Sequence, residues 1–150
     1  MIGRLVELLS GGPAEAPEVE QQRIAVATCV LLLELAHADG EFDASEQQLL
    51  EELVTTRFEL DAEARQELLE LAQQKRQASV DLYAFTRVLN DNFTAEEKQA
   101  LVKELWHLVY SDGQMHHHEE YLVRRISDLL HIPHRLMIAA KLEAAKAASR

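Results

Sequence analysis

Two stretches of the sequence combine carboxylates with a glycine at the same spacing. In the first, Asp39 directly precedes the glycine and Glu46 lies six positions after it; in the second, 73 positions later, Asp112 and Glu119 do the same. This is the spacing of the back half of an EF-hand loop, which binds Ca²⁺ through oxygen atoms. The repeat therefore indicates a duplicated unit in which cation binding is one candidate chemistry.

The helices expected after these stretches determine where the two glutamates point. Glu46 lies three and four positions before Leu49 and Leu50, and Glu119 lies four positions before Val123. These spacings place each glutamate on the apolar face of its helix. Both are thus predicted to face the protein interior, where an ionised carboxylate is costly unless something offsets its charge.

Three explanations are open for these inward charges. The first is helix capping, because Asp43 and Glu46 have the spacing of a capping box. The second is an ion pair with a cation from another helix, for which Arg124, Arg125 and Lys141 are candidates. The third is a bound divalent cation, Ca²⁺, Mg²⁺, Mn²⁺ or Zn²⁺, and no other cofactor is expected.

A metal site would have to be shared between the two stretches. The first ligand position of an EF-hand loop is Leu35 in one copy and Leu108 in the other, so neither copy alone can form a calcium cage. Residues 116–118 are all histidine, but consecutive helical residues diverge by about 100°, so only one of them could join the site. The predicted ligands are Asp39, Asp43, Glu46, Asp112, His116 and Glu119.

The rest of the sequence predicts an all-α protein that positions these stretches. The chain has 150 residues with few glycines and prolines, and no alternating pattern long enough for a strand. We expect about seven helices in two pseudo-symmetric helix-turn-helix-helix halves, with the fourth helix joining them, in one domain over residues 18–150. Residues 1–17 are predicted to be a short amphipathic helix and a linker. The seven helices are expected at about residues 18–38, 44–58, 62–77, 79–90, 95–110, 117–130 and 133–147.

Composition excludes several classes of function. The net charge of −11 argues against nucleic acid as a partner. The single cysteine, Cys29, excludes an internal disulfide and lies in an apolar run where a thiol usually packs. No apolar stretch is long enough for membrane insertion, and the N-terminus does not read as a signal peptide, so a cytoplasmic protein is expected. No catalytic residues are identified.

Three segments together resemble the bacterial tellurite-resistance TerB family, over about residues 20–145. They are the doubled Asp-Gly motif, residues 80–87 (VDLYAFTR) and residues 124–130 (RRISDLL). The resemblance implies an all-helical fold of two related halves, acidic residues gathered at the Asp-Gly loops and a capacity to bind metal ions. It also implies a role in tellurite and other stress responses with a protein partner, including membrane-associated complexes; a related domain occurs in a membrane-anchored DnaJ-type co-chaperone.

The two loops match the family unequally. The first is intact from Asp39 to Glu46, whereas the second has His116 where an acid is common and Ser111 where alanine is common, which would shift that loop toward a softer ion. The resulting hypothesis is a non-enzymatic binding or scaffold domain with a divalent cation at its acidic loops. The alternatives are a metal-independent scaffold whose acids cap helices, and a metal-dependent enzyme, which would need an open coordination position.

Overall fold

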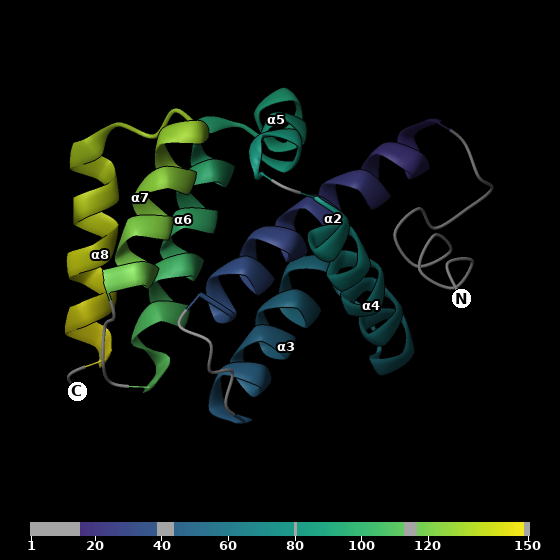
Figure 1. Cartoon of the computed structure of the whole chain (residues 1–150), viewed down its shortest axis with the longest axis horizontal. Coiled ribbons are helices and arrows are strands. Elements are labelled where there is room, and N and C mark those ends of the chain that lie inside the picture. The colour runs from purple at the N-terminus through teal and green to yellow at the C-terminus, as the bar shows by residue number, and fades with distance from the viewer. Residues whose placement is uncertain (1–15, 39–43, 80, 113–116, 149–150) are drawn as a thin grey trace.

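Helices make up nearly all of the chain that the computed structural model describes, which is residues 16–38, 44–79, 81–112 and 117–148 (Figure 1). No strand occurs within these ranges, so the predicted all-α fold is confirmed. The short helix predicted near the N-terminus lies outside the described residues. The elements are α2 (Ala16–Ala36), α3 (Ala44–Phe58), α4 (Ala62–Ala78), α5 (Tyr83–Asn92), α6 (Ala95–Val109), the 3₁₀ turn η1 (Tyr110–Asp112), α7 (His117–Leu129) and α8 (His134–Ala148).

The predicted duplication is visible in the way the helices pack. In the first half α2 packs along α4 and also contacts α3; in the second half α6 packs along α8 and also contacts α7. The two halves meet where α2 contacts α6 and α7, while α5 contacts both α2 and α7 and connects them (Figure 1). Each half is therefore a helix-turn-helix-helix unit, as the sequence predicted.

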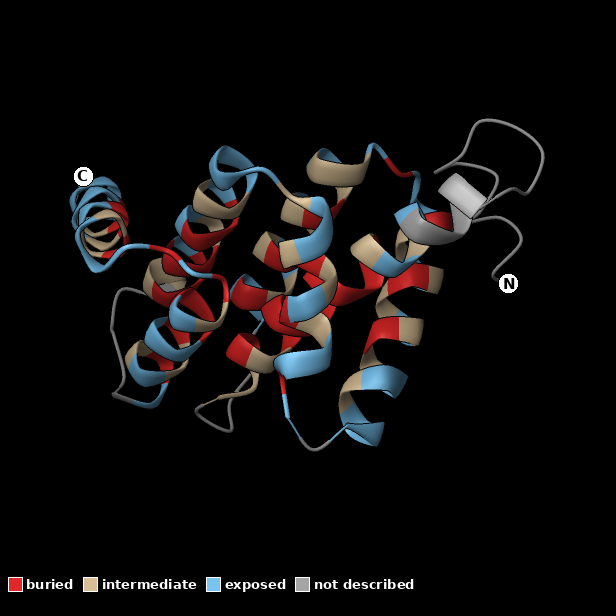
Figure 2. Ribbon diagram, turned by 90° about the horizontal axis from the view of Figure 1, so that it is seen from above, coloured by how far each residue is buried: buried red, intermediate tan, exposed pale blue. Residues whose placement is uncertain are grey.

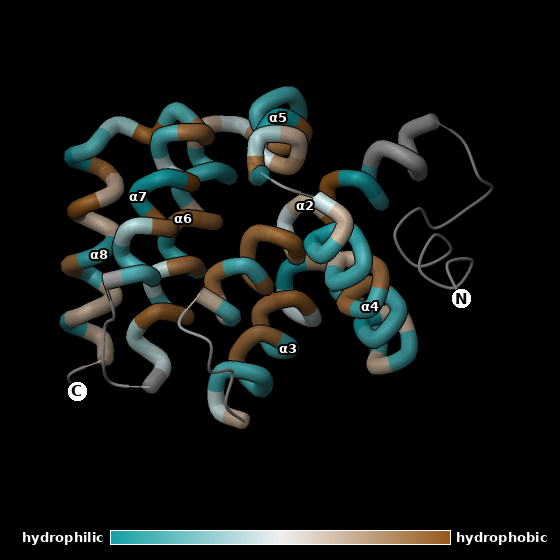
Figure 3. The backbone as a smooth tube through the Cα atoms, viewed as in Figure 1, coloured by the Kyte–Doolittle hydropathy of each residue, from teal (hydrophilic) through white to brown (hydrophobic). Residues whose placement is uncertain are grey.

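The core is built around α2, which contacts five other helices. Every residue from 25 to 33 is buried, which explains why this helix has no polar face. Figure 2 shows that the buried residues of the other helices lie on their inner sides, and Figure 3 shows that these positions are largely hydrophobic. This helix is therefore surrounded by others.

Two helix starts differ from the sequence prediction for local reasons. α5 begins at Tyr83 rather than near residue 79, because Ser79 is the extended C-cap of α4 and the carboxylate of Asp81 accepts a hydrogen bond from the Tyr83 N–H at 2.9 Å. α8 begins one residue late, because Pro133 precedes it and accepts the Met137 N–H at 3.1 Å. The other boundaries agree within about two residues.

A capping box lies at the start of α6. The Glu97 N–H donates to the Thr94 hydroxyl at 3.1 Å, and the Thr94 N–H donates to the Glu97 carboxylate at 2.8 Å. These reciprocal bonds satisfy two backbone groups that a helix N-terminus otherwise leaves unpaired.

Turns of the same kind follow α3 and α7, centred on residues 72 rather than 73 positions apart, and the sequence does not predict them. Glu59 and His131 both have positive φ, 52° and 61°. In each turn the next residue donates its N–H back into the helix, from Leu60 to the Thr55 carbonyl at 3.3 Å and from Ile132 to the carbonyl five residues earlier at 2.9 Å. Both turns are Schellman-type C-caps that use a residue other than glycine at the left-handed position.

We therefore expect Glu59→Gly and His131→Gly each to raise the free energy of unfolding by about 0.5–1 kcal/mol, because glycine adopts positive φ without the cost of a Cβ. Urea denaturation measures this change. Gln66→Gly, at an exposed position inside α4, is the control and should lower stability by about 1 kcal/mol. If both turn variants are also less stable than the parent, the left-handed strain is absent.

Candidate functional site

The two glutamates of the repeated motif are buried. Glu46 is only 5 % exposed and Glu119 only 4 % exposed, and each lies in the first turn of its helix, α3 or α7. The prediction that both face the interior is confirmed. Charged residues are almost never this deeply buried without compensating contacts.

The repeat of 73 positions continues along both helices. On α3 the buried row is Glu46, Leu50 and Val54, at four-residue spacing. On α7 the matching row is Glu119, Val123 and Ser127, all of them buried. Leu49, which the sequence also placed on the apolar face, is only partly buried and packs against the core, as do Leu53 and Phe58. Each glutamate thus extends an apolar row to the rim of the core, at equivalent places in the two halves.

The structure brings the neighbourhood of the second loop against the helix of the first. η1 directly precedes the second glycine, and it contacts α3 as well as α6 and α8. In Figure 1, η1 and the N-terminal end of α3 lie at the same end of the molecule. A site shared by both loops requires this proximity.

Most of the predicted ligand set lies beyond what is described. Asp39, Asp43 and His116 are outside the described residues, and Asp112 is described only through its backbone, as the last residue of η1. Among the side chains that are described, no group of three or more histidines, cysteines, aspartates or glutamates could hold a metal ion. The metal ligands therefore stay predictions, of which burial has been determined only for Glu46 and Glu119.

A cluster of charged and aromatic residues surrounds the first turn of α7. Lys141 of α8 donates to the carboxylate of Glu120 at 2.7 Å, and Arg124 lies 3.5 Å from the same carboxylate. The Lys141 ammonium also lies 5.6 Å from the centre of the Trp106 ring, which lies 6.3 Å from the ring of Tyr110 in η1. This chain of contacts links α6, η1, α7 and α8 beside Glu119.

Three cations are candidates from the sequence as partners of the inward glutamates. Two of them, Arg124 and Lys141, bind Glu120, the residue after Glu119. The third, Arg125, is exposed and makes no ion pair within the described part of the chain. Neither Glu46 nor Glu119 is without an interaction, so capping and ion pairing stay open beside metal binding. Glu120 was missed because nothing local in the sequence distinguishes it from a solvent-exposed acid.

Cys29 is not suited to nucleophilic chemistry. It is fully buried on α2, and burial raises the pKa of its thiol far above the ordinary range. Burial therefore disfavours the thiolate, which is the form that reacts or binds metals. The sequence prediction that this cysteine packs in the core is confirmed.

The described helices include none that is both long and apolar enough to cross a membrane. In a comparison with protein families, the family described as "Tellurite resistance protein TerB" matches residues 25–142. No curated protein and no solved structure matches the chain.

Proposed function

Because the chain belongs to the tellurite-resistance TerB family, we propose that it is a non-catalytic binding domain that holds a divalent cation at its two Asp-Gly loops. The observation that carries the proposal is the pair of buried carboxylates, Glu46 and Glu119, at equivalent positions of α3 and α7. A bound cation would offset the charge of both and join the two halves of the molecule. The cation-loaded end then binds a protein partner in the cytoplasm, during tellurite or other stress and within a membrane-associated complex.

The chemistry of the ligand set restricts the ion. Oxygen ligands from Asp39, Asp43 and Glu46 suit Ca²⁺, Mg²⁺ or Mn²⁺, whereas His116 beside Glu119 would favour a softer ion such as Zn²⁺. Contact between η1 and α3 supports sharing of ligands from both loops. The ion supplies a fixed positive charge, and the protein supplies the carboxylates and the geometry around it.

A binding role is favoured over catalysis by the residues near the loops. Catalysis would need an activated nucleophile or an open metal position next to a pocket. The cysteine of this chain is buried with a raised pKa, and the basic groups close to Glu119, Arg124 and Lys141, are engaged by Glu120. If the bound metal had a coordination position open to solvent, the favoured alternative would be a metal-dependent enzyme.

We expect the metal-free protein to gain stability when a divalent cation is added. A ligand present at one hundred times its Kd adds about 2.7 kcal/mol, which for a domain of this size is a rise in Tm of roughly 5–10 °C. Thermal unfolding and calorimetric titration with Ca²⁺, Mg²⁺, Mn²⁺ and Zn²⁺ measure the effect. Asp39→Asn, Glu46→Gln and Glu119→Gln should each remove most of it, because each removes a charged ligand from a shared site.

The matched control is Glu96→Gln, which removes one exposed acid from the first turn of α6 and should leave the cation response unchanged. If the parent protein responds to no cation, metal binding is wrong. A loss of stability in Glu46→Gln without metal would then favour the second candidate, a scaffold in which the acids cap helices. A response to Zn²⁺ alone, abolished by His117→Ala with His118→Ala, would assign it to the histidine run instead of the loops.

A further inference from the structure

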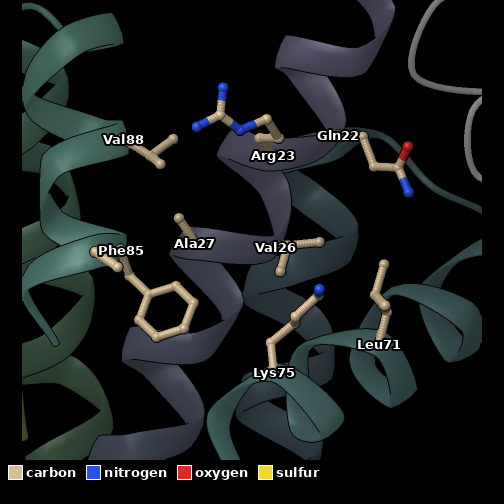
Figure 4. A pocket seen from close by; sticks show the side chains of 9 residues that line it. Gln22, Arg23, Val26, Ala27, Leu71, Lys75, Phe85 and Val88 are labelled. Atoms are coloured by element: carbon tan, nitrogen blue, oxygen red, sulfur yellow. The ribbon is translucent and has the colours of Figure 1, made fainter. Parts of the chain in front are cut away.

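An apolar groove of about 480 Å³ opens between α2, α4 and α5. Figure 4 shows its arrangement: Val26 and Ala27 of α2 form the floor, Phe85 and Val88 of α5 form one wall, and Leu71 of α4 forms the other. The groove lies along the N-terminal half of α2, whereas the first loop follows the C-terminal end of that helix.

The groove exists because two helices that pack on α2 diverge from each other. Both α4 and α5 contact α2 extensively but make little contact with one another. A strip of α2 between them is therefore left without a covering helix. Leu71, Phe85 and Val88 are only partly buried, as expected for side chains that line an uncovered strip.

Basic side chains border this groove although the chain as a whole carries a net charge of −11. Lys75 of α4 and Arg23 of α2 line it, and Arg87 lies in the adjoining depression formed by α2 and α5, which also contains Asp91. Lys75 and Arg87 are exposed and have no hydrogen bond or ion pair with the described residues. An apolar strip bordered by cations is complementary to an apolar face bordered by acids.

We propose that this groove binds an amphipathic α-helix of a partner protein that carries acidic residues beside its apolar face. Such a helix places apolar anchors at positions i, i+3, i+4 and i+7, which suits a strip that runs along one helix between two others. Its carboxylates lie beside Lys75 and Arg87. A nucleic acid is a poorer occupant, because the net negative charge of the chain repels a phosphate backbone and the floor of the groove is apolar.

The N-terminal residues of this chain offer a competing occupant, but a less complementary one. Residues 2–9 carry an apolar stripe with one acid, Glu7, and one base, Arg4. Their net charge is zero, so they gain little from the cations that border the groove. A partner helix with several acids is favoured for this reason. The groove is a separate surface, so the binding of a partner helix there does not depend on whether the cation site exists.

The test uses the full chain and a labelled peptide of leucine, alanine and glutamate, with leucine at i, i+3, i+4 and i+7 and glutamate flanking that face. Fluorescence anisotropy should show saturable binding that weakens as salt is added, because the charged contacts are exposed. Lys75→Glu and Ala84→Glu should each weaken binding at least tenfold. Both positions are exposed, and circular dichroism and Tm verify that each variant remains folded.

Two controls make the result specific. Arg135→Glu reverses an exposed cation on α8 that has no ion pair with the described residues and is far from the groove in the sequence, and it should leave binding unchanged. A peptide with lysine in place of glutamate should bind the parent protein at least tenfold more weakly and should regain affinity for Lys75→Glu. Absence of binding, or equal binding to the parent and to both groove variants, overturns the proposal. The proposal is also overturned if the peptide binds only to the double variant Leu5→Asp with Val6→Asp, because this result would mean that the N-terminal residues occupy the groove in the parent protein.

Discussion

Trp106→Ala is expected to lower the free energy of unfolding by about 3–5 kcal/mol, among the largest effects of any substitution in this protein. Trp106 is completely buried on α6 and is the largest of the fully buried side chains. Its removal loses the transfer free energy of the indole ring and leaves a cavity that α2, α7 and α8 cannot easily fill, because these helices are held by other contacts. Urea denaturation monitored by circular dichroism measures the loss.

Trp106→Phe is the matched control. The indole Nε1 is buried and has no hydrogen-bond partner among the described residues, so phenylalanine should lose ring volume but no hydrogen bond. We expect a cost of about 1–2 kcal/mol, well below that of alanine. Equal losses of stability for the two variants would mean that the indole N–H has a hydrogen-bond partner outside the described residues.

The same substitution bears on the candidate cation site. The Trp106 ring contacts Tyr110 of η1 and the ammonium of Lys141, which in turn holds Glu120 beside Glu119. Without the ring, the first turn of α7 loses support from both α6 and α8. Trp106→Ala should therefore weaken any cation response more than Trp106→Phe does, even at a temperature where both variants are folded.

The sequence predicted much of the fold because the relevant signals are local or periodic. The apolar period located the helices, including the start of α6 at Ala95. The repeat at 73 positions correctly paired the two halves. The burial of Glu46 followed from its position one turn before Leu50, since side chains four residues apart share a helix face.

Other features could not be predicted because they depend on long-range contacts or on a choice between local interactions. Asp81 delays the start of α5 because its side chain binds the Tyr83 N–H. Glu59 and His131 adopt left-handed conformations that propensity assigns to glycine, because the Leu60 and Ile132 side chains are buried beyond them. The groove between α4 and α5 could not be predicted either, because it depends on the angles at which these two helices pack on α2.

The candidate site, like the fold, could be predicted from the sequence only in part. Its glutamates could be placed from periodicity alone, but the contacts of Glu120 with Lys141 join residues 21 positions apart that belong to no shared pattern. Sequence spacing placed Arg124 and Lys141 near the correct helix but did not identify Glu120 as a partner of either. The packing of α7 against α8 brings Lys141 to Glu120, whereas Arg124 pairs with Glu120 within α7.

Glu104→Ala is expected to lower the free energy of unfolding by about 2–3 kcal/mol, because it leaves Arg57 partly buried without its anion. Arg57 of α3 donates twice to Glu104 of α6, from Nε at 3.0 Å and from Nη2 at 2.7 Å. The two side chains are only 16 % and 22 % exposed, and the guanidinium also lies 6.0 Å from the centre of the Phe93 ring. The residual exposure keeps the cost below that of a fully buried pair.

This ion pair links the first half of the molecule to the second, so its energy should depend on both partners. A double-mutant cycle of Arg57→Ala and Glu104→Ala should give a coupling energy of about 1–2 kcal/mol, measured by urea denaturation. The matched control is the pair of Lys103 and Glu143, which lie 3.6 Å apart with side chains 51 % and 64 % exposed. Solvent screens that pair, so its coupling should be below about 0.5 kcal/mol. Equal coupling in the two cycles would contradict a role for the buried pair in holding the halves together.

If the halves are held this way, Glu104→Ala should also reduce the affinity for any cation bound by both loops. The reason is that the helices that carry Glu46 and Glu119 would no longer be fixed relative to each other.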